Sequence, residues 1–368
     1  SSNGSIPSDG HGTHVAGIVG AKGNNGSYVS GVNWNVKLMA LGGSSGTTSI
    51  VLEAYGYILD QRAIYDSTGG ASGAFVVATN SSFGVNNADC NSATYSLWND
   101  MYNAMGEYGI LSCGATMNNN SNVDVTGDVP TGCDSDYMVA VTNTTRNDSK
   151  NSGAAYGLTT IDLGAPGTQV LSTYTGGGTS SLSGTSMASP VAAGIAGLIK
   201  SQYPDLTPSE LAIRLSATAD NIYDINPEYY LLLGSGRVNA NNAVTYSNNQ
   251  FNTIPVRMGL ANFSATDLLH GNGDSAFDPG ETIDMDISLY NYSIMGSENV
   301  NVYLTSADSR INIIEGTILN LNVLPEDTLI LDQAFSLSIN DSADVGICVF
   351  TIGVQQDGQN LNSFELSL

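Results

Sequence analysis

The sequence has few charged residues, and positive charges are the scarcer kind. Of 368 residues only 12% are charged, and 10 Lys and Arg face 34 Asp and Glu, for a formal net charge of -24. A chain this acidic is repelled by phosphate backbones and anionic membrane surfaces, so we expect neither nucleic acid nor acidic lipid as a partner. The balance fits a protein secreted into salty surroundings, and it also fits a surface whose charge serves only solubility.

Long hydrophobic runs are also missing. No stretch approaches the roughly 18 apolar residues that predict a transmembrane helix. The chain opens on SSNGSIPSDG, which reads as a loop and not as the start of a secretory leader, so we expect a chain that has lost its leader or a fragment. Hydrophobic residues still make up 41%, enough for a real core, and the length favours about two domains.

Cysteine is scarce, with four residues at positions 90, 113, 133 and 348. No CxxC or histidine-rich spacing typical of a metal site is present. Because Asn, Ser and Gly are abundant, we expect an extracellular protein with one or two disulfides. Spacing does not determine the pairing; we predict Cys90 with Cys133, since both lie in polar loops.

Short apolar runs alternate with helical patterns over the first 245 or so residues. This alternation predicts an α/β fold with a mainly parallel sheet and helices on both faces, and such sheets carry their sites at the carboxyl ends of the strands. The expected strands are residues 36–41, 73–82, 109–115 and 137–144. The expected helices are residues 48–66 and 95–109.

The pattern changes after this region. Residues 248–256 are predicted to be a linker, within the polar stretch YSNNQFNTIPV. Beyond it, segments such as ETIDMDISLYNY and GICVFTIGVQQ alternate apolar and polar residues with period two. We therefore predict a first domain over residues 1–247 and a smaller antiparallel β-sandwich over residues 257–368.

Two histidines stand close together in SDGHGTHVAGIVG. His11 and His14 are three residues apart before an apolar helical run. Three interpretations are open. The two histidines could bind a metal, one could begin a helix and be satisfied by backbone groups, or one could act as a general base at a helix N-terminus. No acidic third ligand with supporting spacing accompanies the pair.

A serine begins the helical run in SLSGTSMASPVAAGIAGLIK, residues 181–200. Ser186 is expected to serve both as a helix N-cap and as a nucleophile. Gly184 lets the backbone approach a ligand, and Pro190 is expected in the first helical turn, where a missing N–H does little harm. The backbone N–H of Ser186 would be unpaired at the helix start and could stabilise an oxyanion.

The stretches DGHGTHVAGIVG and GTSMASPVAAGIAGLI resemble the histidine and serine signatures of the subtilisin-like serine proteases, the subtilases. The resemblance extends from residue 8 to about residue 245, and LGAPG and GSGRVNANNAV match further landmarks. It implies that His11 is the general base and Ser186 the nucleophile, while His14 packs inside its helix. His270 lies in the second domain and is therefore a less suitable candidate for the general base than His11.

The resemblance also implies substrate-binding residues. VVATNSSFG resembles the family's strand that pairs with an extended peptide, and the residues assigned to that pairing are Ser82, Phe83 and Gly84. GILSCGATMNNN takes the place of the segment with the side-chain oxyanion donor, which falls on Asn118. Met117 replaces the usual glycine, and Asn119 and Asn120 leave the register open by one, so an Asn-rich surface turn is the alternative. The residues implied to line the P1 pocket are Gly114, Ala115 and Thr116.

One catalytic member has no match. The family's aspartate precedes the histidine at the end of the first strand, and only ten residues precede His11. Asp9 is read as part of the loop that enters the helix. We therefore expect the aspartate on an upstream segment, either cleaved and still bound or absent. Since it fixes the imidazole tautomer, residues 1–368 alone are expected to be nearly inactive.

Acidic residues cluster in GNGDSAFDPGETIDMD, residues 271–286. Oxygen ligands two to four residues apart in a Gly-containing loop suit calcium, although the spacing is not that of an EF-hand. The stretch resembles the opening of Ig-like modules attached to bacterial surface and secreted enzymes. A structural calcium and a plain solvated turn are both open, and the ligands predicted for calcium are Asp274, Asp278 and Glu281.

The predicted function is that of a secreted or cell-surface bacterial serine endopeptidase acting on polypeptides. His11 would take the proton of Ser186, and Ser186 would attack the scissile carbonyl. The Ser186 N–H and the Asn118 amide would hold the oxyanion before water hydrolyses the acyl-enzyme. The alternative is a non-catalytic surface or adhesion protein on a subtilase scaffold, for which the missing aspartate is the only support.

Overall fold

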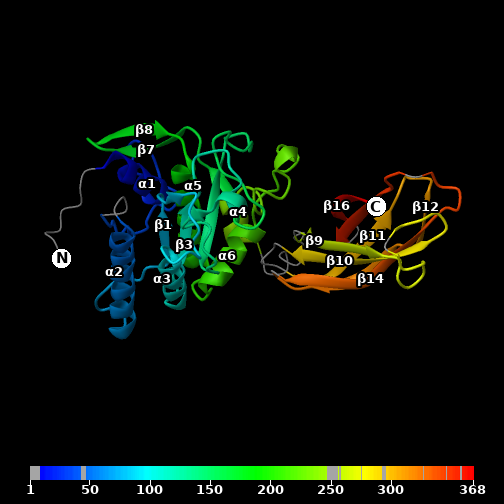
Figure 1. Ribbon diagram of the computed structural model, residues 1–368. Coiled ribbons are helices and arrows are strands. Elements are labelled where there is room, and N and C mark those ends of the chain that lie inside the picture. The colour runs from blue at the N-terminus through cyan, green and yellow to red at the C-terminus, as the bar shows by residue number, and fades with distance from the viewer. Residues whose placement is uncertain are drawn as a thin grey trace. The chain divides into compact units, whose positions relative to one another are not determined.

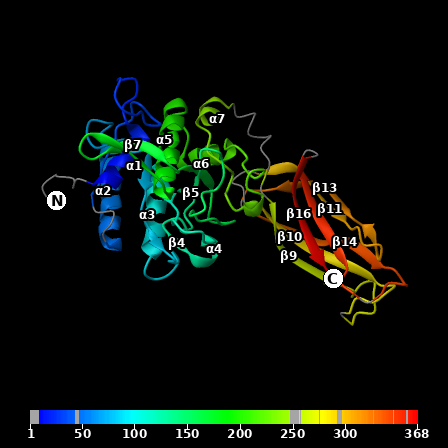
Figure 2. The ribbon, with the colours of Figure 1, turned by 90° about the horizontal axis from the view of Figure 1, so that it is seen from above.

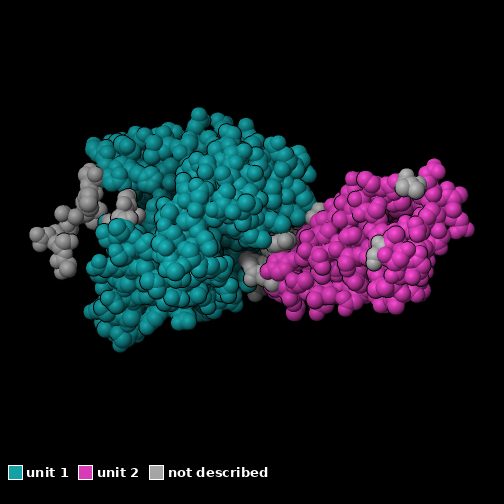
Figure 3. Space-filling view, viewed as in Figure 1, with its two compact units in different colours: residues 1–247 teal, residues 248–368 magenta. Residues whose placement is uncertain are grey.

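The computed structural model describes residues 9–42, 47–246, 256, 258–274, 276–291, 296–325, 327–344, 346–356 and 359–368. The chain divides into two compact units, residues 1–247 and residues 248–368 (Figure 3). The predicted linker over 248–256 lies outside the described residues, apart from Val256. No helix in the described ranges combines the length and apolar character needed to cross a membrane.

The first unit is built on a four-stranded parallel sheet with the order β1–β3–β5–β6 (Figure 1). Its strands are β1 (Ala78–Ser81), β3 (Leu111–Ala115), β5 (Met138–Thr144) and β6 (Leu163–Pro166). Every residue of β3 and β5 is buried, as expected for central strands of a parallel sheet covered on both faces. The carboxyl ends of all four strands meet at one edge.

Helices and short strand pairs surround this sheet. The helices are α1 (Gly10–Gly20), α2 (Thr48–Ser67), α3 (Ser96–Glu107), α4 (Val123–Thr126), α5 (Thr185–Gln202), α6 (Pro208–Ala217), the 3₁₀ turn η1 (Pro227–Tyr229) and α7 (Ala240–Thr245). The strand pairs are β2 (Val85–Asn86) with β4 (Asp128–Val129), and the hairpin of β7 (Val170–Tyr174) with β8 (Gly178–Leu182).

Side chains of the sheet strands point alternately to two helical layers, because successive residues of a strand face opposite sides. Cys113 and Val139 join the core beneath α5, whereas Met138 joins the core formed with α2 and α3. The predicted parallel sheet with helices on both faces is therefore confirmed. The helices expected over 48–66 and 95–109 are confirmed as α2 and α3.

Helix α5 lies close to the sheet because its inward face is made of small residues. Ala188, Ala192 and Ala196 are fully buried in the same core as the strands. A side chain on Gly194 would come within 2.8 Å of Val32, so this glycine lets the neighbouring chain approach. The small-residue face thus fixes the depth at which the start of α5 sits at the sheet edge.

The strand predicted over residues 36–41 does not form, and this prediction was wrong. The segment has the apolar character of a strand, but Leu38 and Met39 stay 47% and 38% exposed. No strand of the described residues pairs with it. Apolar character alone does not create a strand, because strand backbone groups need a neighbouring ladder to bond with.

The second unit consists of two four-stranded antiparallel sheets, ordered β12–β14–β10–β9 and β13–β11–β15–β16 (Figure 2). Met285 and Phe335 of the first sheet share one buried core with Val302 and Ile352 of the second. The prediction of an antiparallel β domain is confirmed, whereas its kinship with Ig-like modules stays a prediction. The strands are β9 (Met258–Thr266), β10 (Thr282–Asn291), β11 (Ser297–Thr305), β12 (Ile311–Glu315), β13 (Thr317–Val323), β14 (Thr328–Ile339), β15 (Val349–Gln356) and β16 (Gln359–Ser367).

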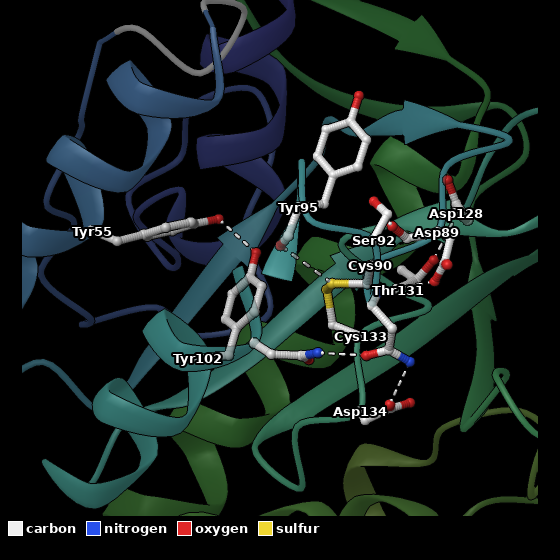
Figure 4. The surroundings of a disulfide bond; sticks show 12 residues. Tyr55, Asp89, Cys90, Ser92, Tyr95, Tyr102, Asp128, Thr131, Cys133 and Asp134 are labelled. Atoms are coloured by element: carbon white, nitrogen blue, oxygen red, sulfur yellow. Dashed lines mark hydrogen bonds between the residues drawn. A yellow bond between two sulfur atoms is a disulfide. The ribbon is translucent and has the colours of Figure 1, made fainter. Parts of the chain in front are cut away.

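A disulfide joins Cys90 to Cys133, so the predicted pairing is confirmed (Figure 4). Its two Cα atoms are 5.1 Å apart, within the range that a disulfide spans. The bond ties the loop before α3 to the segment that follows β4. Cys113 and Cys348 are buried free thiols, and burial raises the pKa of Cys113 to about 12.

Candidate active site

Ser186 is the second residue of α5, one position inside the helix. The N-cap is Gly184, with a φ of 155°, and as a glycine it makes no side-chain cap bond. The prediction of Ser186 as the cap was therefore wrong. In the described part of the chain the backbone N–H of Ser186 has no hydrogen-bond partner, as expected in the first turn of a helix. That N–H is available to an external acceptor.

Pro190 was predicted in the first turn of this helix but is its sixth residue. At this depth a residue normally donates its N–H to the carbonyl four positions earlier. Proline has no N–H, so the carbonyl of Ser186 lacks its helical donor. The hydroxyl of Ser82 donates to that carbonyl instead, at 2.8 Å.

Asn118 lies against the start of the same helix. Its Oδ1 accepts the backbone N–H of Thr185 at 2.9 Å and the Thr185 hydroxyl at 3.2 Å. The Thr185 hydroxyl also donates to the carbonyl of Thr116. Because Oδ1 receives these donors, the amide NH₂ of Asn118 is the end left for another acceptor.

The two asparagines that follow take other places. Asn120 Oδ1 accepts from the Lys150 ammonium at 2.8 Å, and Asn119 Oδ1 is buried without a partner within the described ranges. Burial lowers the pKa of Lys150 to about 8, and its ammonium lies 4.5 Å from the ring centre of Tyr229. Of the three asparagines, only Asn118 contacts the start of α5 through a bond in the structure described.

The two histidines of α1 differ in environment. Asp9 is the N-cap of this helix and accepts the N–H groups of His11 at 3.2 Å and Gly12 at 2.6 Å. It therefore belongs to the segment that enters the helix, as the sequence predicted. The Gly12 N–H and then the His11 N–H lower the pKa of Asp9. The imidazole of His11 is exposed and makes no hydrogen bond with any described residue. His14 is fully buried.

The β7–β8 hairpin is hydrogen-bonded to α1 and is followed along the chain by α5. His14 Nε2 lies 3.0 Å from the carbonyl oxygens of both Val170 and Ser180, and Ser172 donates to the carbonyl of His14. The chain then leaves β8 and enters α5 through Gly184. Figures 1 and 2 both show α1 beside α5. His11 and Ser186 therefore open neighbouring helices, although no bond joins their side chains in the described structure.

The three residues predicted to pair with substrate follow directly after β1. Ser82 exchanges two bonds with Ser186: its hydroxyl donates to the Ser186 carbonyl, and the Ser186 hydroxyl donates to the Ser82 carbonyl at 3.3 Å. Phe83 is half-buried beside Trp98, with ring centres 6.4 Å apart. Gly84 is exposed, and a side chain there would collide with the carbonyl of Val129.

The three residues predicted to line the P1 pocket end β3 and begin the next loop. Gly114, Ala115 and Thr116 are all buried. A side chain on Gly114 would stand 2.9 Å from Thr131, so the two segments are in close contact. Hydrogen bonds thus bring four of the predicted residues together around the start of α5, at the carboxyl edge of the sheet: Ser82, Thr116, Asn118 and Ser186.

Asp128 is a buried residue of this region that sequence reasoning missed. Its Oδ2 accepts the N–H of Met117 at 2.8 Å and the hydroxyl of Thr131 at 2.7 Å. Burial raises the pKa of Asp128 to about 6, against the lowering effect of these two bonds. Met117 immediately precedes Asn118, so a carboxylate secures the backbone that carries the Asn118 amide.

The residues predicted to bind calcium do not converge. Glu281 accepts the N–H groups of Asn272 and Asp278, and Asp274 accepts that of Ala276. Across the described residues, no group of three or more His, Cys, Asp or Glu side chains is placed to hold a metal ion. Calcium at this loop therefore stays a prediction.

Asp267 precedes the acidic loop in sequence and bonds to it, and sequence reasoning did not single it out. Its Oδ2 accepts the N–H groups of Gly273 and Asp274, while its Oδ1 is buried and has no partner in the described part of the loop. A buried carboxylate oxygen without a donor is costly unless a cation or water satisfies it. This atom is the feature of the loop that best fits a cation.

Comparison with known proteins gives the same assignment for the first unit. The chain is 32% identical over 242 residues to thermitase from Thermoactinomyces vulgaris, covering 65% of this chain and 76% of thermitase. It is 34% identical over 240 residues to a thermophilic serine proteinase from a Bacillus species, covering 64% of this chain and about half, 52%, of that protein.

A solved structure agrees with these relatives. A protease from Pseudoalteromonas arctica superposes with a TM-score of 0.54 at 32% identity, covering 66% of this chain and 72% of that one. The sequence pattern of the subtilase family matches residues 3–254, more than half of the chain. The chain therefore belongs to the subtilase family.

Proposed function

We propose that the protein is a secreted serine endopeptidase in which Ser186 is the nucleophile and His11 the general base. The observation that carries the proposal is the arrangement at the start of α5. There Asn118 bonds to Thr185, the residue before Ser186, and among the described residues neither the Ser186 N–H nor the Asn118 NH₂ has a partner. A serine hydroxyl needs a base to become a nucleophile, and His11 begins the neighbouring helix.

The proposed mechanism uses these groups in turn. The His11 imidazole takes the Ser186 proton as the hydroxyl attacks the scissile carbonyl, and later returns it to the leaving amine. The Ser186 N–H and the Asn118 NH₂ donate to the oxyanion that forms. Water, activated by His11, then hydrolyses the acyl-enzyme. Asn118 suits this role because Thr185 donates to its Oδ1, which leaves its NH₂ as the group that can donate to an oxyanion.

The carboxylate behind His11 is proposed to come from an upstream segment. Asp9, the carboxylate nearest in sequence, uses its oxygens to cap α1 through the N–H groups of His11 and Gly12. A histidine without a carboxylate partner has neither its tautomer nor its developing charge stabilised, at a cost of about 10⁴ in turnover. Residues 1–368 alone should therefore turn over slowly, and addition of the segment should restore the rate.

The proposed substrate is an extended polypeptide paired with residues 82–84. Its P1 side chain would lie against Gly114, Ala115 and Thr116, at the carboxyl edge of the sheet. The disulfide between Cys90 and Cys133 supports an extracellular location, because such bonds persist in oxidising compartments. The second unit is proposed to be an Ig-like accessory module.

Labelling with a fluorophosphonate probe tests the nucleophile. Wild-type protein should be modified at Ser186, located by peptide mass spectrometry, and Ser186→Ala should lose both the label and peptide hydrolysis. Ser181→Ala is the matched control, because this serine is exposed in β8 and lies close in sequence. The control should be labelled like the wild type.

Two outcomes would contradict the proposal. Full labelling of Ser186→Ala would remove Ser186 from the nucleophilic role. A wild-type protein that stays unlabelled with the upstream segment present would favour the alternative function, a non-catalytic surface or adhesion protein. Full-rate hydrolysis by residues 1–368 alone would refute only the proposed origin of the carboxylate.

A further inference from the structure

The start of α5 contains a defect in its helical hydrogen bonding. Pro190 stands four residues after Ser186, at the position whose N–H would normally bond to the Ser186 carbonyl. Proline supplies no N–H, and its ring crowds the carbonyl four residues earlier and turns it away from the helix axis. The residue proposed as nucleophile therefore has a carbonyl that its own helix does not satisfy.

A side chain from outside the helix fills this place. The Ser82 hydroxyl donates to the Ser186 carbonyl at 2.8 Å, and the Ser82 carbonyl accepts the Ser186 hydroxyl at 3.3 Å. These reciprocal bonds hold the residue from both its backbone and its side chain. Ser82 can replace the missing donor only while its own hydroxyl hydrogen points at α5.

Two further residues set the direction of that hydrogen. The Asn80 NH₂ donates to the Ser82 oxygen at 2.9 Å, so the Ser82 hydrogen is left for the Ser186 carbonyl. The Asn80 Oδ1 accepts the hydroxyl of Ser189 at 2.8 Å, which fixes which end of the amide faces Ser82. Ser189 is fully buried and lies one helical turn after Ser186.

The bonds form a closed ring with the backbone of α5: Ser189 donates to Asn80, Asn80 to Ser82, and Ser82 to the carbonyl of Ser186. Each of these donors has one acceptor within the ring. We propose that Asn80 and Ser189 are positioning residues that keep Ser82 in the place of the missing Pro190 N–H and so fix the backbone from which the Ser186 hydroxyl projects. The proposal rests on the proposed function of Ser186, and neither residue touches the substrate.

Ser189→Ala in the full-length protein is the first test. It removes the hydroxyl that orients Asn80, so kcat should fall about 10- to 100-fold, as expected for slight misplacement of a reacting group, while KM changes little. Ser216→Ala is the matched control, because this serine is also buried in a helix but lies in α6, away from the site. The control should keep the wild-type kcat.

A second substitution separates positioning from a general structural effect. Pro190→Ala restores an N–H four residues after Ser186, which can bond to the Ser186 carbonyl without Ser82. Loss of the Ser189 hydroxyl should then lower kcat much less than it does in the wild-type background. A structural defect at Ser189 would not be relieved by this change, so equal losses in both backgrounds would overturn the proposal.

Hydrogen exchange gives a readout that does not depend on turnover. Ser189→Ala should speed amide exchange in residues 185–189, and Ser216→Ala should not. Unchanged exchange together with wild-type kcat would overturn the positioning ring. Failure of the proposed function is distinct: it would appear as wild-type protein that neither labels nor hydrolyses, while the exchange measurement still decides whether the ring holds α5.

Discussion

At the scale of single residues, Asp128 makes stability depend on pH. Burial raises its pKa from 3.8 to about 6 in the folded protein. The fold therefore favours the neutral carboxyl, and this stabilisation is complete below about pH 4 and lost as the pH rises through about 6. Asp128→Asn keeps an oxygen for Met117 and Thr131 but cannot ionise. We expect its free energy of unfolding, relative to wild type, to rise by up to about 3 kcal/mol between pH 4 and pH 7.

Urea denaturation at a series of pH values measures this difference. The matched control is Asp136→Asn, because Asp136 is an exposed carboxylate of the same segment. This control separates the effect of a buried carboxylate from that of removing a carboxylate at the surface. A difference that stays constant with pH for Asp128→Asn would show that Asp128 titrates at its ordinary pKa in the folded protein, which would contradict the prediction.

At the scale of elements, the disulfide fastens a long stretch of the first unit. Cys90 and Cys133 are separated by 43 residues, and the enclosed segment carries α3, β3 and β4. Closing a loop of this length in the unfolded chain is expected to stabilise the fold by about 2–4 kcal/mol. We expect Cys90→Ser with Cys133→Ser to lower the free energy of unfolding by this amount.

Reductant provides the control for the disulfide prediction. Dithiothreitol should lower the melting temperature of the wild type and leave that of the double variant unchanged, since the described Cys113 and Cys348 are free thiols. A wild type that melts at the same temperature with and without reductant, after mass spectrometry has shown the bond reduced, would refute the expected contribution.

The acidic loop of the second unit supports a prediction about calcium. Two of the three predicted ligands, Asp274 and Glu281, accept backbone N–H groups. The atom that best fits a cation is Oδ1 of Asp267, which is buried without a partner in the described loop. We expect a chelator to lower the melting temperature of the second unit and added Ca²⁺ to restore it. Asp267→Asn should remove this sensitivity. A melting temperature that the chelator leaves unchanged would argue against calcium here.

Sequence reasoning reached the elements that carry long, regular patterns. Such patterns mark the strands β1, β3 and β5, the helices α2 and α3, and the two helices that begin in the histidine and serine motifs. It failed where the outcome depended on a distant partner: residues 36–41 look like a strand but find no neighbouring strand in the described structure. The position of Pro190 beyond the first turn was missed because Ser186 was expected to cap the helix, whereas the cap is Gly184.

The same limit applies to the candidate site. His11, Ser186 and Asn118 stand in motifs that resemble a known family, so the sequence indicated them. Asn80 and Ser189 stand 109 residues apart and are joined by one hydrogen bond, which no local pattern announces. Asp128 was missed for the same reason, since its partner Met117 belongs to another segment. Polar contacts between distant segments require coordinates.

At the scale of the whole molecule, charge is distributed unequally along the chain. Residues 248–368 hold 16 of the 34 acidic residues but only two of the 10 basic ones, and the first unit is also acidic overall. Such a field attracts cationic peptides and repels anionic ones, and salt weakens it because the screening length falls from about 30 Å at 0.01 M to about 3 Å at 1 M.

Two peptides that share one cleavage sequence and differ only in distant Lys or Glu residues test this field. If the proposed function holds, kcat/KM of the full-length protein should be several-fold higher for the Lys peptide at low salt, and the ratio should approach one at high salt. An uncharged peptide with the same cleavage sequence controls for effects of salt on the enzyme itself. Equal kcat/KM values at low salt would show that the acidic surface does not steer substrate. A ratio that persists at high salt would instead place the discrimination in direct contacts near the scissile bond, because only contacts closer than the screening length survive there.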